Sequence, residues 1–336
     1  MGTTNRQFRL AARPSGLPTR EVWDYVEEPA REPGDGEVLV ETLYISLDPA
    51  MRGWMNDNKK SYITPVAIGD VMRAGAVGRV VASRDPAFSP GQEVRGSLGV
   101  QTCPVVKGHS LTLVDSSIAP LPRFLGTLGM PGMTAYFGLL DIGRPSAGET
   151  VVVSAAAGAV GTVVGQIARI LGCRIVGIAG GTDKCRYIVD ELGFDAAIDY
   201  KADDVAQALK QHCPDGIDIY FDNVGGEILD TVLRFLAMKA RIVICGAISQ
   251  YNNTKPPAGP ANYLSLLVNR ASMQGMIVFD YTDRYGEAYA QLAEWDAAGK
   301  LKSREQLVKG FDRFPEALLM LFAGKNTGKL VLQVED

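Results

Sequence analysis

A glycine-spaced stretch near the middle of the chain has the pattern of a phosphate cradle. Ala156-x-Gly158-x-x-Gly161 follows the apolar residues Val151–Val153 and precedes a segment whose apolar residues recur at helical spacing. This is the dinucleotide fingerprint with alanine in place of its first glycine. Its second glycine lets the backbone approach a pyrophosphate, its third lets helix and strand pack closely, and the helix N-terminus offers N–H groups to the phosphates. The pattern predicts a nucleotide-binding strand, turn and helix.

The residues that follow the fingerprint bear on which nucleotide binds. An acidic residue about 20 positions further on usually bonds the ribose 2′-OH of NAD. Here that place is Ala179-Gly180-Gly181, and Lys184 follows within one helical turn. A 2′-phosphate would meet glycine and an ammonium group instead of a repelling carboxylate. Asp183 lies close by, but as an early helix residue it is interpreted as a cap. The sequence favours NADPH over NADH.

Other kinds of chemistry are disfavoured by the residue types. Five cysteines occur without a CxxC pair and only two histidines are present, so we expect reduced thiols and no metal site. No G-x-S-x-G elbow supports a serine hydrolase. The net charge of −4 argues against nucleic acid as the main partner.

The hydropathy pattern indicates a chain without a membrane partner. The uncharged stretch between Glu149 and Arg169 contains Ser154, Gln166 and several glycines, which makes a membrane span a poor interpretation. The N-terminal residues have no apolar core of the kind that a secretory signal needs. We therefore expect a cytoplasmic protein.

The chain has 336 residues, a length that suits two domains. The pattern of its apolar residues changes along the chain. From Glu37 to about Val114, short apolar runs separated by Pro, Asp and Gly predict a small β-barrel or sandwich. After Val151, apolar runs alternate with helical patterns, which predicts βαβ units and a parallel sheet. A strand, a helix and a last strand are expected after Gly299, and we expect this tail to rejoin the first domain.

Five motifs, "DPAMRGWM", "AAAGAVG", "GGTDKC", "FDNVGG" and "CGAISQYN", together resemble the medium-chain dehydrogenases/reductases. Within that superfamily the chain resembles the zinc-independent branch of prostaglandin reductases, alkenal double-bond reductases and curcumin reductases, over nearly its whole length. The resemblance implies an α/β protein with a GroES-like β-barrel domain at 1–125, a doubly wound Rossmann domain at 126–299, and a tail at 300–336 that returns to the first domain. It also implies a homodimer.

The same resemblance implies the reaction and the cofactor site. The reaction would be NADPH-dependent reduction of the carbon–carbon double bond of α,β-unsaturated aldehydes or ketones. Lys184 is similar to the family's 2′-phosphate lysine, Tyr200 to its partner near the adenosine, and Asn223 to a nicotinamide-side contact. The implied cofactor-binding set is Ala157, Gly158, Ala159, Val160, Gly161, Lys184, Tyr200, Asn223, Cys245, Gly246, Ala247, Ile248, Ser249, Gln250, Tyr251, Met276, Ile277, Val278 and Asn326.

Hydride addition to the β-carbon of such a substrate develops negative charge on the carbonyl oxygen. Without zinc, a hydrogen-bond donor must stabilise that oxygen: a tyrosine hydroxyl, a backbone N–H or the cofactor's ribose hydroxyl. Tyr251 and Tyr62 are the candidate catalytic residues, because an unperturbed phenol with a pKa of about 10 is protonated at neutral pH. Water is an alternative source of the final proton. Some relatives place a tyrosine where this chain has Val268, so that tyrosine is not expected to act here.

The stretch around Tyr62 has a further feature. Met51, Trp54 and Met55 precede the tyrosine and suit an oily unsaturated carbonyl compound. The alternative is a loop packed into the core, which is the preferred interpretation of Met51. Asp48 and Arg52 are expected to pair at i,i+4 if this turn is helical. Two alternative functions share the cofactor cradle: an NADPH quinone oxidoreductase, and a non-catalytic NADPH-binding protein. The sequence leaves the physiological substrate open among lipid enones, short alkenals and diketones.

Overall fold

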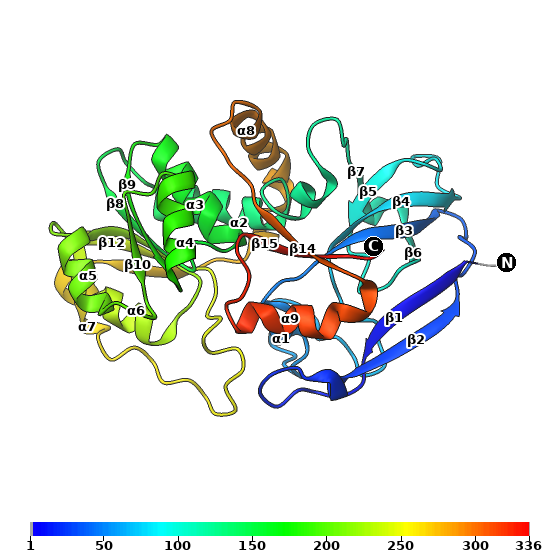
Figure 1. Ribbon diagram of the computed structural model, residues 1–336, viewed down its shortest axis with the longest axis horizontal. Helices are drawn as coiled ribbons and strands as arrows, with labels where there is room; N and C mark the ends of the chain where they lie inside the picture. Colours follow the sequence, from blue (N-terminus) through cyan, green and yellow to red (C-terminus); the bar gives the residue numbers. More distant parts are fainter. Residues whose placement is uncertain (1–2, 336) are drawn as a thin grey trace. The chain divides into compact units, whose positions relative to one another are not determined.

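The computed structural model describes residues 3–335, which fall into two compact units (Figure 1). Unit 1 comprises the residues up to Leu125 together with those from Glu305 onward. Unit 2 comprises Gly126–Arg304. The chain therefore leaves unit 1 once and re-enters it near the C-terminus.

Unit 1 is built on a mixed sheet in the order β14-β15-β3-β4-β5-β7, with β6 paired to β3 and a separate hairpin of β1 and β2. Its strands are β1 (Thr4–Leu10), β2 (Trp23–Pro29), β3 (Glu37–Ser46), β4 (Ala76–Ser83), β5 (Glu93–Gly96), β6 (Val105–Lys107), β7 (Leu111–Leu113), β14 (Glu305–Lys309) and β15 (Lys329–Gln333). Its helices are α1 (Met51–Trp54), α9 (Phe314–Phe322) and the 3₁₀ turns η1 (Arg20–Val22), η2 (Gly108–Ser110), η3 (Leu121–Leu125) and η8 (Phe311–Arg313).

The C-terminal segment is part of the core of unit 1. Strand β15 pairs antiparallel with β3, and β14 pairs parallel with β15. The ring of Phe8 on β1 lies 5.2 Å, centroid to centroid, from both Phe311 and Phe314, and Trp23 on β2 packs against Phe314 at 5.0 Å. Buried aromatic contacts of this kind join residues more than 280 positions apart into one core.

An ion pair inside unit 1 corrects one expectation. Asp48 does not pair with Arg52; its carboxylate lies 2.7 Å from the Lys329 ammonium of β15, and both side chains are almost fully buried. The Arg52 guanidinium donates instead to the Gly16 carbonyl and to Asn56. The i,i+4 rule fails here because α1 begins only at Met51, so Asp48 is outside the helix.

Unit 2 contains a six-stranded parallel sheet in the order β10-β9-β8-β11-β12-β13. The strands are β8 (Thr150–Ser154), β9 (Arg174–Ala179), β10 (Ala196–Asp199), β11 (Ile217–Asp222), β12 (Leu236–Ile244) and β13 (Ser272–Gly275). In sequence order this is 3-2-1-4-5-6, the order of a doubly wound Rossmann sheet, so the prediction of a parallel sheet is confirmed. The strand order reverses between β8 and β11.

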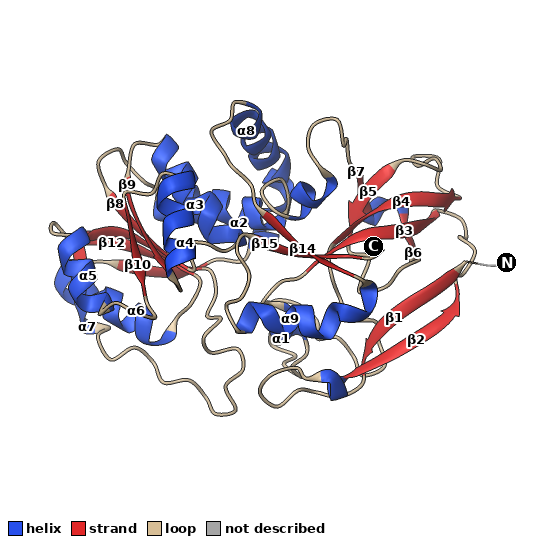
Figure 2. Ribbon diagram, in the orientation of Figure 1, coloured by secondary structure: helices blue, strands red, loops and turns tan. Residues whose placement is uncertain are grey.

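Helices alternate with these strands, as Figure 2 shows. They are α2 (Met130–Phe137), α3 (Ala159–Ile170), α4 (Thr182–Arg186), α5 (Val205–His212), α6 (Gly226–Val232), α7 (Leu264–Asn269) and α8 (Tyr285–Ala297), with short turns at η4 (Gly138–Gly143), η5 (Tyr187–Glu191), η6 (Leu233–Phe235) and η7 (Val278–Arg284). Every residue of β8 is buried, as expected for a central parallel strand covered on both faces. Among residues 3–335, no helix combines the length and apolarity needed to cross a membrane.

Candidate functional site

The glycine-spaced loop lies between β8 and α3, as the sequence predicts. Ala155, the first residue after β8, has a left-handed backbone with φ of 49°, which turns the chain sharply. Gly158 is the N-cap of α3 and supplies no side chain to the N–H groups of the first turn. Because those donors have no side-chain cap, and the helix dipole is positive at this end, the loop from Ala157 to Gly161 suits an anion.

The third glycine of the motif is required by close packing. A Cβ atom on Gly161 would lie 2.4 Å from the Ala155 carbonyl oxygen and 2.8 Å from the Cα of Ala156, so α3 packs directly on the turn that follows β8. At Gly158 the corresponding distance to the Ala155 oxygen is 3.1 Å. Gly161 thus sets how near the helix N-terminus comes to the strand end.

Replacing Gly161 by alanine is expected to weaken NADPH binding about tenfold and to lower the unfolding temperature, because the added methyl group pushes α3 away from the turn at a cost of about 1–3 kcal/mol. Isothermal titration and thermal unfolding measure the two effects. Gly286→Ala is the matched control, since a Cβ at that position in α8 meets nothing within 4 Å. An unchanged affinity in Gly161→Ala would contradict the prediction.

The end of β9 forms a cationic corner, which we define as Gly180, Gly181, Lys184, Tyr200 and Lys201. The Tyr200 ring lies against Gly180, where a Cβ would come within 2.6 Å of the ring. The Lys201 ammonium lies 6.0 Å from the centre of the same ring. Burial, and then the nearby Lys201 charge, lower the pKa of Lys184. The ammonium groups of Lys184 and Lys201 repel each other, and a bound anion would offset that repulsion.

The carboxylates near the cationic corner are held by the protein. Asp199 accepts the backbone N–H of Gly181 at 2.7 Å and that of Lys201 at 3.1 Å. Asp183 does not cap α4; it forms an exposed ion pair with Arg186 at 2.7 Å. The corner therefore presents no carboxylate in the manner of an NAD-specific site.

Lys184→Met is expected to raise the dissociation constant for NADPH about 30-fold, because it removes one charge-assisted hydrogen bond worth about 2 kcal/mol. The dissociation constant for NADH, which lacks the phosphate, should change by less than about threefold. Fluorescence titration of each nucleotide measures both. Lys210→Met makes the same charge change on the exposed face of α5 and serves as the control. Equal losses for both nucleotides would overturn the assignment of Lys184 to the phosphate.

The end of β11 is organised by a buried carboxylate, Asp222, which is not among the site residues predicted from the sequence. Asp222 is fully buried and accepts hydrogen bonds from the hydroxyls of Ser154 at 2.9 Å and Tyr220 at 2.8 Å, and from the N–H groups of Val224 and Gly225 at 3.0 Å. Burial, and then the charge of Asp222, raise the pKa of Tyr220 well above its usual range. The only sequence signal is a polar residue that ends each of two apolar strands.

This network fixes Asn223, a predicted nicotinamide contact. The Asn223 N–H donates to the Ser154 hydroxyl at 2.9 Å, and its side-chain amide donates to the Ser154 carbonyl at 2.8 Å. The backbone N–H groups of Cys245 and Gly246 donate to the Asp222 carbonyl at 2.9 and 3.1 Å. The ends of β8, β11 and β12 are thereby joined.

The predicted segment from Cys245 to Tyr251 packs on the loop after β11. Ile248 and Ser249 donate their N–H groups to the carbonyls of Asn223 and Val224, both at 3.2 Å. Burial, and then Asp222, raise the pKa of Cys245 to about 12, so its thiol stays protonated near neutral pH. The Tyr251 hydroxyl accepts the Ala247 N–H at 3.1 Å, which closes the turn.

The remaining predicted cofactor residues lie on two different units. Met276, Ile277 and Val278 follow the edge strand β13, and the Met276 N–H donates to the Ile244 carbonyl at the end of β12. Every predicted cofactor residue of unit 2 thus follows the carboxyl end of a strand, where ligands of open α/β sheets bind. Asn326 belongs to unit 1, where its amide donates to the Gly328 carbonyl at 3.0 Å, just before β15.

The other candidate catalytic tyrosine also belongs to unit 1. Tyr62 is 51% exposed, and its hydroxyl oxygen accepts the indole N–H of Trp54 at 3.0 Å. Tyr251 is partly buried in the turn that it closes. Of the two phenols, Tyr62 is the more accessible to a ligand.

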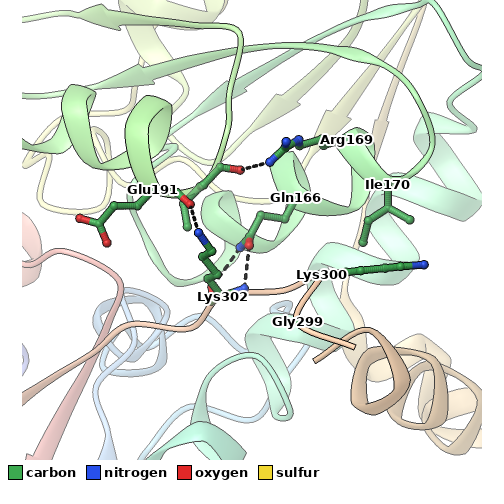
Figure 3. A pocket seen from close by; sticks show the side chains of 8 residues that line it. Gln166, Arg169, Ile170, Glu191, Gly299, Lys300 and Lys302 are labelled. Carbon is green, nitrogen blue, oxygen red and sulfur yellow. Dashed lines mark hydrogen bonds between the residues drawn. The ribbon is translucent and has the colours of Figure 1, made fainter. Parts of the chain in front are cut away.

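A separate polar pocket of about 360 Å³ lies on unit 2 (Figure 3). It is lined by Gln166, Arg169, Ile170, Glu191, Leu192, Gly299, Lys300 and Lys302. Lys302 donates to the Glu191 carbonyl at 2.8 Å, and Arg169 points toward the Leu192 carbonyl (Figure 3). These cations lie at the C-terminal ends of α3 and η5, where they offset negative helix dipoles. No predicted cofactor residue lines this pocket.

Comparisons with known proteins bear on this arrangement. Residues 6–114 match the model of an N-terminal domain of oxidoreductases, and residues 159–295 match that of zinc-binding dehydrogenases. The chain is 50% identical to the putative NADP-dependent oxidoreductase YfmJ of Bacillus subtilis, over 100% of this chain and 99% of the relative. The chain belongs to the medium-chain dehydrogenase/reductase family.

Two further matches show which members of this family the chain is similar to. The NADPH-dependent curcumin reductase of Escherichia coli is 45% identical over 98% of this chain and 97% of its own. The crystal structure of CurA from Vibrio vulnificus in complex with NADPH superposes with a TM-score of 0.93 at 47% identity, over 98% of this chain and 99% of that one. The predicted family and fold class are confirmed. Within residues 3–335, no three His, Cys, Asp or Glu side chains are grouped as metal ligands.

Proposed function

We propose that this medium-chain reductase uses NADPH to reduce the carbon–carbon double bond of α,β-unsaturated aldehydes and ketones. The observation that carries the proposal is the cationic corner at the end of β9, where Lys184 and Tyr200 lie beside Gly181 and Gly180. The nearby carboxylates already accept backbone N–H groups or pair with Arg186. This is the chemistry that distinguishes a 2′-phosphate from a 2′-hydroxyl. Similarity to curcumin reductases supports the type of acceptor.

The residues that follow the carboxyl ends of the unit 2 strands suit the groups of the cofactor. In this proposal the loop from Ala157 to Gly161 binds the pyrophosphate, because no side chain caps the N–H groups of the first turn of α3. Asn223 with the segment from Cys245 to Tyr251 orients the nicotinamide. When bound, NADPH supplies a hydride. The chain holds the cofactor and the substrate in position for the transfer. Tyr62 donates a hydrogen bond to the carbonyl oxygen on which negative charge develops. Tyr251 shapes the nicotinamide segment through its bond with Ala247.

The first experiment mixes the purified protein with NADPH and a medium-chain 2-alkenal, with NADH in parallel. Cofactor absorbance gives the rate, and mass spectrometry with NMR identifies the product. Saturated aldehyde with a clear NADPH preference supports the proposal. Allylic alcohol would show carbonyl reduction and contradict it. Turnover of quinones alone would indicate a quinone oxidoreductase, and NADPH binding without oxidation by any acceptor would indicate a non-catalytic protein.

We also propose that the protein is a homodimer joined along β13 and α7. Strand β13 is an edge of the unit 2 sheet, with unpaired backbone groups on its outer side. On α7 the apolar residues Leu267 and Val268 are 74% and 65% exposed. Neighbouring apolar side chains with this exposure are typical of a surface that binds another protein. The resemblance to family members supports a second copy of the chain as that partner.

Leu267→Glu is expected to shift the protein from dimer to monomer, because two carboxylates would be buried in a two-fold interface. Light scattering coupled to gel filtration measures the mass. Leu307→Glu on β14 of unit 1 is the control, since Leu307 is also exposed, at 40%, but belongs to neither β13 nor α7. A monomeric unmodified protein would refute the dimer outright.

A further inference from the structure

The segment between α1 and β4 carries Tyr62, and one side chain determines how its hydroxyl is directed. The indole N–H of Trp54 donates to the Tyr62 hydroxyl at 3.0 Å. An indole nitrogen has a proton to give and no lone pair to accept one, so the direction of this bond is fixed. The Tyr62 proton must therefore point to an acceptor other than Trp54.

Arg73, the neighbouring cation, has the same limitation. Its guanidinium lies 5.7 Å from the centre of the Trp54 ring and donates to the Thr64 carbonyl at 3.0 Å. A guanidinium has five N–H donors and no acceptor. Neither Trp54 nor Arg73 can take the Tyr62 proton.

The two ends of the loop from Trp54 to Val66 are held together by a backbone hydrogen bond and by the Arg13 side chain. The Val66 N–H donates to the Trp54 carbonyl at 2.9 Å. One guanidinium nitrogen of Arg13 donates to the carbonyls of Met55 at 2.7 Å and Val66 at 2.6 Å. Trp54 itself is 5% exposed, whereas Tyr62 is 51% exposed. A rigid buried donor thus supports an exposed phenol, the arrangement by which a catalytic group is held in one orientation.

We propose that Trp54 is a positioning residue, whose indole N–H orients the Tyr62 hydroxyl so that the phenol donates to the carbonyl oxygen of the unsaturated substrate. This inference rests on the proposed function. Hydride adds to the β-carbon, the π-electron pair of the double bond moves toward the carbonyl, and the oxygen takes the Tyr62 proton. Water returns a proton to the phenolate, and the enol then rearranges to the saturated carbonyl compound.

A double-mutant cycle with Trp54→Phe and Tyr62→Phe tests the proposal. Phenylalanine at position 54 keeps an aromatic ring for Arg73 to cover but has no N–H. Trp54→Phe is expected to lower kcat about fivefold, the effect of one neutral hydrogen bond, with the KM for NADPH unchanged. In the Tyr62→Phe background the same substitution should change kcat by less than about 1.5-fold, because the group through which it acts is gone.

A structural role for Trp54 would give a different result. The two losses would then multiply in the double variant, and the affinity for NADPH would fall together with the rate. Multiplied losses, or a Trp54→Phe rate within about 1.5-fold of the unmodified protein, would overturn the inference. Both outcomes leave the proposed function intact if the unmodified protein reduces the 2-alkenal, whereas an inactive unmodified protein would refute the proposed function itself.

An NMR measurement covers the case in which Trp54→Phe does not fold. The chain has three tryptophans, so three indole N–H signals are expected from the ¹⁵N-labelled protein. Tyr62→Phe should move one of them strongly and speed its exchange with solvent. If all three signals keep their positions and exchange rates, Trp54 does not donate to Tyr62 and the inference fails.

Discussion

Replacing Asp222 by alanine is expected to lower the free energy of unfolding by about 3–5 kcal/mol. The carboxylate is fully buried and accepts from two hydroxyls and two backbone N–H groups. Alanine leaves those donors buried without an acceptor, and each lost hydrogen bond to a charged group costs about 1.5–3 kcal/mol. Partial relaxation of the loop keeps the total below the full sum. Chemical denaturation followed by circular dichroism measures the change.

Asp222→Asn separates the acceptor from the charge. The asparagine oxygen can keep the bonds that the Oδ1 atom of Asp222 now accepts, but its NH₂ group would face the Gly225 N–H, which now also approaches Oδ2 at 3.2 Å. We expect a loss of about 1–3 kcal/mol, clearly smaller than for alanine. NADPH binding should weaken in both variants, because Asn223 and Cys245 depend on the same network. An alanine variant within about 1 kcal/mol of the unmodified protein would contradict this account.

The elements of the candidate site that could be predicted from sequence have local signals. The loop after β8 is marked by glycine spacing within a few residues, and the structure shows why Gly161 has no side chain. The corner after β9 is marked by the lack of an acid and the presence of Lys184. The alternation of strands and helices predicted the parallel sheet, and the carboxyl ends of its strands carry the predicted residues of unit 2. The roles of those residues remain predictions.

The missed features depend on residues far apart in the chain. Ser154 and Asp222 are 68 positions apart and meet only because β8 and β11 are neighbours in the sheet. Asp48 and Lys329 are 281 positions apart and meet because β15 lies beside β3. A rule for neighbours on one helix assigned Asp48 the wrong partner, since no helix spans it. Such pairs become visible only when strand order and register are known.

Tyr62→Phe is expected to lower the turnover of a 2-alkenal about 100-fold, with less than a threefold change in the dissociation constant for NADPH. The substitution removes only the hydroxyl that is proposed to stabilise the developing charge, and loss of such a donor costs about 2.7 kcal/mol in transition-state energy. The bond from Trp54 and the 51% exposure of Tyr62 are the reasons to prefer it over Tyr251. Steady-state kinetics and fluorescence titration give the two quantities.

Tyr251→Phe provides the comparison. Its hydroxyl accepts the Ala247 N–H in a turn of the nicotinamide segment, so its loss should act mainly on cofactor binding, raising the dissociation constant for NADPH about fivefold. The two variants are therefore expected to separate: one loses turnover and the other loses affinity. A 100-fold loss of turnover in Tyr251→Phe alone would exchange the two roles. Losses below threefold in both variants would exclude a tyrosine hydroxyl and leave the proton to water or to the cofactor's ribose hydroxyl.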